Sequence, residues 1–149
     1  MAEIKMTTKE LLQRLFNTTS VKRFIKRHGG DMVDTPFHTY LKEQCAQKGV
    51  NPAQVITKAG IERTFGHHIF SGRKNPSRDK VIQLAFGFEM NYEQTQELLK
   101  VARKSTLYPK IMRDAVVIQG LERKLGLNVV QDALEELTLP LIGREGRYE

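Results

Sequence analysis

The chain has 149 residues, of which 40% are hydrophobic and 28% are charged, and its formal net charge is +7. This composition predicts a folded domain with a small core and argues against a disordered chain. The excess of positive charge favours a polyanionic partner, of which nucleic acid is the simplest. No apolar run approaches the roughly 18 residues of a membrane span, and Met1 is not followed by a charged and then apolar leader. We therefore expect a cytoplasmic protein with no membrane partner.

The chemistry-bearing residues do not form a recognisable catalytic or metal site. Cys45 is the only cysteine, so the sequence has neither a disulfide framework nor a thiolate cluster for zinc. The neighbouring His67 and His68 would diverge by about 100° on a helix, and His28 and His38 are isolated. No phosphate-binding glycine loop, zinc-protease helix or nucleophile elbow is present. We expect no catalytic residue, no metal and no cofactor.

Residues 1–34 have the pattern of two short helices followed by a loop, and we assign them to an N-terminal helical extension. Thr7 and Glu10 form a capping-box pattern. The apolar stripe that follows consists of Leu11, Leu12, Leu15 and Phe16. Thr19 or Ser20 caps the second helix, whose charged face carries Lys22, Arg23, Lys26 and Arg27. That face suits phosphate, but a solvated face on a packing or dimerisation helix is the favoured interpretation.

Residues 35–104 are predicted to form a domain of five short helices without strands. The first helix begins at Pro36. Asn51 is a good N-cap for the second helix, with Pro52 at its first position and Gln54 as capping-box partner. Gly60 ends this helix, and another follows almost at once over residues 62–70. Two short helices joined by a glycine-containing turn are typical of the helix-turn-helix unit, whose second helix enters the DNA major groove.

A helical wheel divides the helix over residues 62–70 into a core face and a polar face. The core face carries Ile61, Phe65 and Ile69. The polar face and its flanks carry Arg63, Thr64, His67, His68 and Ser71. Arginine makes bidentate contacts with guanine, and the other side chains donate to bases or phosphates. An ordinary solvated helix face is the open alternative for each of these residues.

One motif in this region resembles a known family. It consists of Ala59-Gly60-Ile61, then Ile69 after seven residues, and then Ser71-Gly72-Arg73-Lys74-Asn75-Pro76-Ser77. Over about residues 36–102, the chain resembles the Cro/C1-type (XRE family) helix-turn-helix domain. The resemblance implies a five-helix lambda-repressor-like fold that presents its third helix to DNA, commonly as a dimer.

The resemblance also implies which residues contact DNA. It places base contacts on Arg63, Thr64 and His68, to which the helical wheel adds His67. The expected phosphate contacts are Ser71, Arg73, Lys74 and Arg78.

The sequence departs from the family pattern in three respects, the first of which involves two residues. Ile56 stands where the family usually has a small alanine, and Gly66 stands where it usually has isoleucine or valine. We interpret these two as an exchange of size, in which Gly66 makes room for Ile56 where the helices cross. Glu62 suits the helix dipole but would repel phosphate. Phe70 falls near the polar face, where the sequence offers no explanation for it.

Residues 105–149 are predicted to form a C-terminal helical hairpin and tail. Arg78-Asp79-x-Val81-Ile82 is echoed by Arg113-Asp114-x-Val116-Val117. Later residues extend the echo, pairing Asn91, Gln94 and Leu98 with Asn128, Gln131 and Leu134. We expect a helical hairpin over about residues 109–137 and a frayed terminus over residues 143–149.

Together these patterns predict an all-α, sequence-specific regulator of transcription that binds double-stranded DNA. A homodimer is expected, with a regulatory protein as a further partner. The candidate pairing surfaces are the first apolar stripe and the C-terminal hairpin, the latter with Val116, Val117, Leu121, Leu134 and Leu137. Both surfaces are equally well explained as additional core. The alternative function is a protein-interaction adaptor or antitoxin-like module on the same scaffold.

Overall fold

The computed structural model describes residues 6–31 and 35–143, which form helices, turns and loops without a strand. The prediction of an all-α protein is therefore confirmed. The chain divides into two compact units, residues 1–34 and residues 35–149. Apart from Gly143, the tail that was expected to fray lies outside the described residues. Within the described part of the chain, every helix is too short or too polar to cross a membrane.

The first unit contains helices α1 (Thr8–Asn17) and α2 (Val21–His28), followed by the 3-10 turn η1 (Gly29–Asp31). Thr7 and Glu10 make both hydrogen bonds of a capping box, as predicted. Ser20, rather than Thr19, caps α2 by accepting from the backbone N–H of Arg23. No residue of α1 is buried, and α2 buries only Phe24 and His28.

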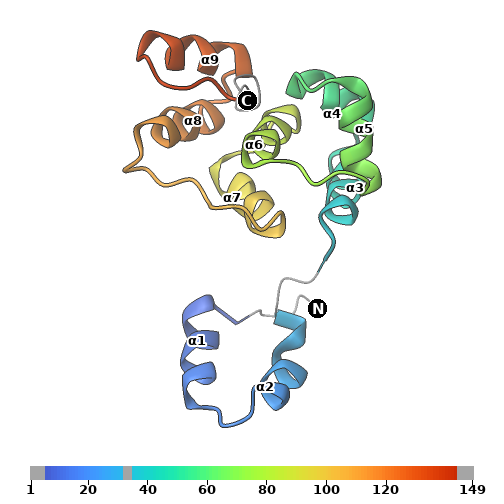
Figure 1. Cartoon of the computed structure of the whole chain (residues 1–149), viewed down its shortest axis with the longest axis vertical. Helices are drawn as coiled ribbons and strands as arrows, with labels where there is room; N and C mark the ends of the chain where they lie inside the picture. The colour runs from blue at the N-terminus through green and yellow to red at the C-terminus, as the bar shows by residue number, and fades with distance from the viewer. Residues whose placement is uncertain (1–5, 32–34, 144–149) are drawn as a thin grey trace. The chain divides into compact units, whose positions relative to one another are not determined.

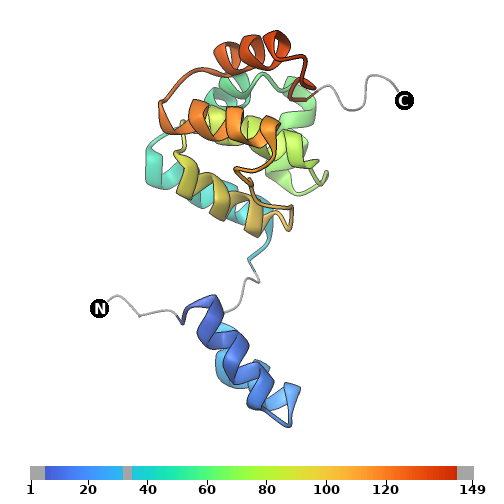
Figure 2. The same cartoon turned by 90° about the vertical axis from the view of Figure 1, so that its left-hand side faces the viewer.

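The second unit is built around a central helix, α6 (Figures 1 and 2). In Figure 1, α3, α4 and α5 lie on one side of α6, while α8 and α9 lie on the other. The bounds are α3 Phe37–Lys48, α4 Pro52–Ala59, α5 Arg63–Ser71, α6 Arg78–Gly87, α7 Tyr92–Val101, α8 Met112–Glu122 and α9 Leu127–Glu136. The five helices predicted over residues 35–104 are therefore present as α3 to α7.

The central position of α6 follows from its composition. Over residues 80–87 of α6, every residue except Lys80 and Gln83 is apolar or small. The helix is buried on almost all of its faces. Val81, Ile82 and Leu84 have no exposed surface. The core that surrounds them is continuous from Leu41 in α3 to Ile142 after α9.

The second half of this unit contains an internal repeat with an offset of 35 residues. Every described non-glycine residue with a positive φ obeys it: Glu89 (58°) matches Lys124 (57°), and Arg103 (59°) matches Thr138 (59°). α7 and α9 begin and end at equivalent positions. The Arg78-Asp79 and Arg113-Asp114 echo is therefore a true structural equivalence.

The later part of the predicted echo is wrong in register. Asn91 makes a capping box with Gln94, but its equivalent is Gly126, and α9 has no side-chain cap. The structural partner of Gln131 is Gln96, because each of these amides bonds both backbone groups of one residue in the loop after its helix. Gln96 holds Leu107, and Gln131 holds Ile142.

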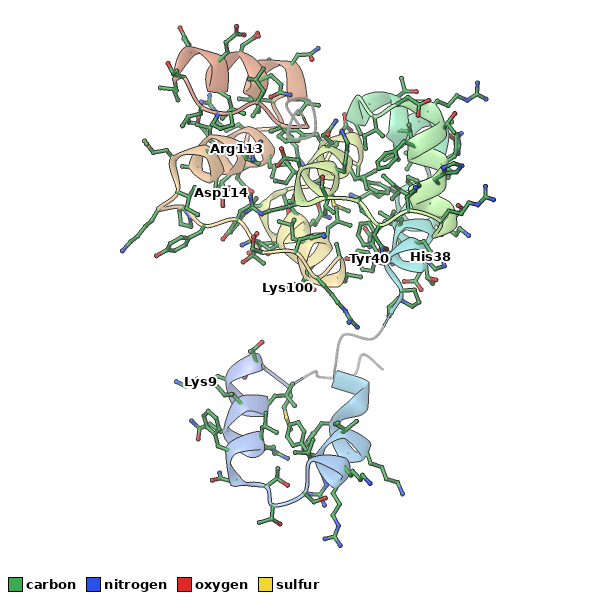
Figure 3. The ribbon with its side chains drawn as sticks, in the orientation of Figure 1. Lys9, His38, Tyr40, Lys100, Arg113 and Asp114 are labelled. Carbon is green, nitrogen blue, oxygen red and sulfur yellow. The ribbon has the colours of Figure 1, made fainter. Side chains whose placement is uncertain are left out.

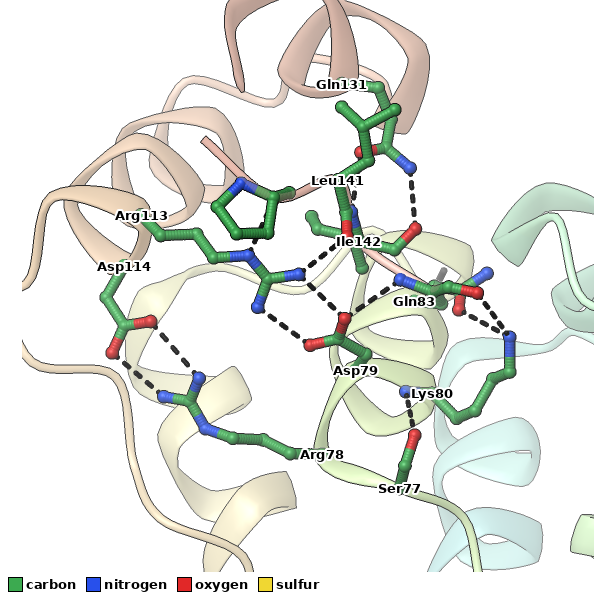
Figure 4. A network of polar contacts seen from close by, with 12 residues as sticks. Ser77, Arg78, Asp79, Lys80, Gln83, Arg113, Asp114, Gln131, Leu141 and Ile142 are labelled. Atoms are coloured by element: carbon green, nitrogen blue, oxygen red, sulfur yellow. Dashed lines mark hydrogen bonds and ion pairs between the residues drawn. The ribbon is translucent and has the colours of Figure 1, made fainter. Parts of the chain in front are cut away.

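The two repeats hold each other through reciprocal ion pairs (Figure 4). Arg78 makes two bonds to the carboxylate of Asp114, and Arg113 makes two to that of Asp79. Each carboxylate also accepts a backbone N–H from the loop of the opposite repeat: Asp114 from Tyr108, and Asp79 from Gly143. The contacts are therefore related by an approximate two-fold relationship. Figure 3 shows Arg113 and Asp114 side by side on α8.

Candidate nucleic-acid interface

α4 and α5 are joined by a tight turn whose geometry depends on Gly60. Gly60 has φ +69°, in the left-handed region that favours glycine. Its N–H donates to the last carbonyls of α4. Asn51 and Gln54 form the predicted capping box at the other end of α4, with both hydrogen bonds at 2.9 Å. Local sequence signals therefore mark where α4 begins and ends.

The buried face of α5 agrees with the helical wheel at Ile61 and Ile69, which are 7% and 1% exposed. Phe65 is half-buried. Phe70 is only 3% exposed and packs against Phe88, with 6.4 Å between ring centroids. The partner of Phe70 lies beyond α6 in sequence, which explains why its position could not be understood from the helix alone.

Ile56 and Gly66 have the predicted exchange of size. A Cβ at residue 66 would lie 2.6 Å from Cγ2, 2.8 Å from Cγ1 and 2.9 Å from Cδ1 of Ile56. Such distances are far inside van der Waals contact, so a side chain at residue 66 and isoleucine at residue 56 exclude each other. Gly66 therefore sets how closely α5 approaches α4.

The opposite face of α5 presents the predicted base-contacting residues. Arg63, Thr64 and His67 are exposed, and His68 is half-buried. All four project from one short helix whose other face is fixed in the core. Their side chains can donate hydrogen bonds to base edges or phosphates.

The loop after α5 brings the predicted phosphate contacts to the end of the same helix. Gly72, with φ +84°, ends α5, and the backbone N–H groups of Arg73 and Lys74 both donate to the carbonyl of His68. The side chains of Arg73 and Lys74 are exposed, as is Ser71, whose hydroxyl donates to the same carbonyl at 3.1 Å. The structure therefore places these cations directly beside the polar face of α5.

A histidine that the sequence did not indicate helps to shape this loop. A Cβ at Gly72 would lie 2.8 Å from Nδ1 of His38, so the imidazole ring is packed on the glycine. His38 belongs to α3, far from Gly72 in sequence. Only the tertiary structure reveals this contact, and glycine at residue 72 is needed both for its φ and for the space.

Glu62 is the N-cap of α5. Its carboxylate accepts from the backbone N–H of Phe65 at 2.7 Å. This hydrogen bond, followed by one from Thr64, holds the pKa of the exposed Glu62 carboxyl below its usual value. A negative charge therefore stays at the start of the polar face, where it satisfies the helix terminus.

The structure gives Arg78 a role different from the predicted phosphate contact. Its guanidinium donates to the carbonyls of Ser105 and Thr106 as well as to the buried Asp114. The bonds to Asp114 join the two repeats, and those to Ser105 and Thr106 hold the loop after α7. The proposed phosphate contacts therefore do not include Arg78.

Gln83 is a further residue that the sequence did not indicate. It is 4% exposed, and its side-chain amide donates to the carbonyl of Ala59 at 3.0 Å and more weakly to that of Gly60 at 3.5 Å. Its oxygen accepts from the ammonium of Lys80 at 3.1 Å (Figure 4). Gln83 therefore caps the C-terminal end of α4 from α6 and fixes the turn that leads into α5.

Comparisons with known protein families, with curated proteins and with solved structures find no match. Among the described residues, no group of three or more His, Cys, Asp or Glu side chains is arranged to hold a metal ion. Cys45 is buried in α3, where desolvation raises the pKa of its thiol. The geometry of α5 and of the loop that follows it is therefore the basis of the proposed function.

Proposed function

We propose that the chain is a sequence-specific regulator of transcription that binds double-stranded DNA and inserts α5 into the major groove. The observation that carries this proposal is the division of α5 into two faces. One face is packed against α3 and α4, and its buried residues are Gly66, Ile69 and Phe70. The other presents an exposed arginine, threonine and histidine beside a loop with two exposed cations.

This arrangement has the parts that a major-groove contact requires. A short helix held rigidly at its back can project bidentate and single donors toward base edges. A cationic loop at its end can bind phosphates and so fix the position of the helix on the duplex. The proposal assigns base contacts to Arg63, Thr64, His67 and His68. It assigns phosphate contacts to Ser71, Arg73 and Lys74.

The helical arrangement from α3 to α7 is also compatible with the Cro/C1-type domain that the motif resembles. In that scheme α4 and α5 are the helix-turn-helix, and α5 is the recognition helix. We propose the lambda-repressor-like arrangement on two grounds. These are the order of the helices and the left-handed backbone conformation of Gly60 between α4 and α5.

A homodimer is part of the proposal, because two recognition helices would contact two half-sites about one helical turn apart. In the C-terminal hairpin, Val117, Leu121 and Leu134 are at most 2% exposed and belong to the core, and Leu137 is the exposed candidate at 60%. The stripe on α1 is better suited, because Leu12, Leu15 and Phe16 are 45%, 39% and 69% exposed. We therefore propose α1 as the pairing surface.

The test is the selection of bound sites from a random pool of duplex DNA. A two-fold symmetric motif would support both sequence-specific binding and pairing. A parallel salt titration with random duplex should show a steep loss of affinity with salt, because several phosphate contacts release counterions.

The alternative, an adaptor or antitoxin-like module that binds a partner protein, is favoured by the exposed apolar residues of the first unit. It predicts negligible binding to duplex DNA even at low salt. That result would overturn the proposed function.

A further inference from the structure

The first unit contains a cleft of about 710 Å³ whose lining is rich in cations. Arg14 contributes from α1, while Arg23, Lys26 and Arg27 contribute from α2. The turn between the helices adds Thr18, Thr19 and Ser20 to the lining. No carboxylate lines the cleft. The lining is therefore suited to an anion with several oxygen atoms.

The cations of the cleft have no structural partner within the described residues. The side-chain nitrogens of Arg14, Arg23, Lys26 and Arg27 make no hydrogen bond or ion pair there. The contrast with the second unit is informative, since Arg78 and Arg113 each make two bonds to a buried carboxylate. The two arginines that stabilise the second unit are therefore each paired with an aspartate, whereas the cations of the cleft are not.

The cations of α2 also lower the stability of the helix, because they repel one another. α2 has eight residues, VKRFIKRH, with four lysines and arginines and no acid. Lys22 and Lys26, like Arg23 and Arg27, are four residues apart, where like charges destabilise a helix. A bound anion would relieve this repulsion, so the clustering is explained better by a ligand than by the fold.

The exposure of the lining indicates which kind of anion fits. Sites for small ligands are mostly apolar and bury most of the ligand. Here all four cations are exposed, and Phe24 and His28 at the base are the only buried lining residues, with ring centroids 4.8 Å apart. Long exposed cations from two helices are suited to successive phosphates of a nucleic-acid strand, which are contacted without regard to base sequence.

We propose that the cleft between α1 and α2 binds phosphate groups of the DNA backbone. This inference rests on the proposed function and adds to α5 a second contact that is independent of base sequence. The first unit then strengthens binding to all duplexes alike, whereas α5 determines which duplex is preferred.

The test compares two variants that remove the same charge from the same helices of the full-length chain. The cleft variant is Arg14→Gln with Arg23→Gln. The control is Lys9→Gln with Lys22→Gln, since neither lysine lines the cleft and Lys9 points away from α2 (Figure 3). Circular dichroism checks that both variants keep their helices. Affinity for a random duplex is then measured as a function of salt.

The cleft variant should lose about two phosphate contacts, which lowers the slope of log affinity against log salt by about 2. Near 0.1 M salt this corresponds to a loss of affinity of one to two orders of magnitude. The control should change far less. The ratio of affinities for selected and random sites should be the same in the cleft variant as in the wild-type chain.

Three outcomes would overturn the inference in distinguishable ways. Equal effects of the two variants would mean that only total charge matters and that the cleft binds nothing. Stoichiometric binding of inorganic tripolyphosphate that the cleft variant loses, with DNA binding unchanged, would assign the cleft to a free phosphate ligand instead. If the wild-type chain binds no duplex at any salt concentration, the proposed function fails and the DNA assignment of the cleft fails with it.

Discussion

Ile56 of α4 occupies the space in which a side chain at residue 66 of α5 would stand, since a Cβ added to Gly66 would lie only 2.6 Å from Cγ2 of Ile56. The two residues form one packing unit, so a change at either one alters the packing of the other. The pair therefore controls the distance between the two helices of the proposed helix-turn-helix.

We predict that Gly66→Ile destabilises the second unit by about 1–3 kcal/mol, because the added atoms overpack the crossing point of the helices. Ile56→Ala should cost about 2–5 kcal/mol through the cavity that it leaves. The double variant exchanges the sizes, so its loss should be smaller than the sum of the two. Urea denaturation of all four chains gives the coupling free energy. Additive effects would contradict the packing unit.

This size exchange could be predicted from the sequence because both residues lie within a motif of known spacing. The caps at Thr7 and Asn51 were predictable for a related reason, since a capping box is formed by residues three apart in the chain. Local signals therefore predicted the starts of α1 and α4 and the polar face of α5.

The rest depended on contacts between residues distant in sequence. Arg103 and Thr138 have positive φ values although they are not glycine, so no local pattern in the sequence indicated these turns. The true register of the repeat is visible only once Gln96 and Gln131 are seen to hold their loops. Arg78 looked like an anion-binding residue at a helix start because Asp114, its partner, is 36 residues away.

The reciprocal pairs lead to a second prediction. Asp114 and Asp79 have side chains only 2% and 9% exposed, and each holds an arginine and a backbone N–H. Asp79→Asn and Asp114→Asn should each cost about 3–5 kcal/mol of stability, because a largely buried arginine loses its countercharge. The two losses should be similar, since the sites are equivalent in the repeat. Chemical denaturation measures both.

The exposed pair between Lys58 and Glu89 is the matched control for this prediction. Its N–O distance of 2.9 Å is the same as that of the Arg78–Asp114 pair, but its side chains are 60% and 66% exposed. Glu89→Gln should cost no more than about 1 kcal/mol, because solvent screens the interaction. If Glu89→Gln lost as much stability as Asp114→Asn, burial would not determine how much such an ion pair contributes.

The proposed DNA contacts lead to a third prediction, which separates base contacts from phosphate contacts. Arg63→Ala should relax preference at one base pair by about 1–3 kcal/mol, because a bidentate contact discriminates between bases. Lys74→Ala should weaken binding to every sequence alike. Affinities for the selected site and for single-base variants of it measure both effects. Equal loss on every sequence in both variants would contradict the assignment.

Glu62 gives a prediction about pH. The hydrogen bond from the N–H of Phe65 holds its carboxyl pKa below the usual value. The charged carboxylate therefore contributes stability above the pKa of the unfolded chain, and this contribution is lost as pH falls through the lowered pKa. Glu62→Gln should lower the melting temperature at neutral pH. The difference from the wild-type chain should disappear in acid, when Glu62 is protonated. A difference that stays constant across this range would contradict the role of the charge.

Gln83 links the repeat to the turn before the recognition helix, and this leads to the last prediction. Gln83→Leu keeps the size of the side chain but leaves the Ala59 carbonyl without its donor, at a cost of about 1–3 kcal/mol. Because that carbonyl ends α4, hydrogen exchange of the Ile61 amide, which is bonded to Ile56 across the turn, should become faster. Gln96→Leu is the matched control, since its amide holds Leu107 in the loop after α7. It should lose similar stability without a local effect at Ile61. If both variants accelerate exchange at Ile61 equally, the effect is global and Gln83 has no particular part in positioning α5.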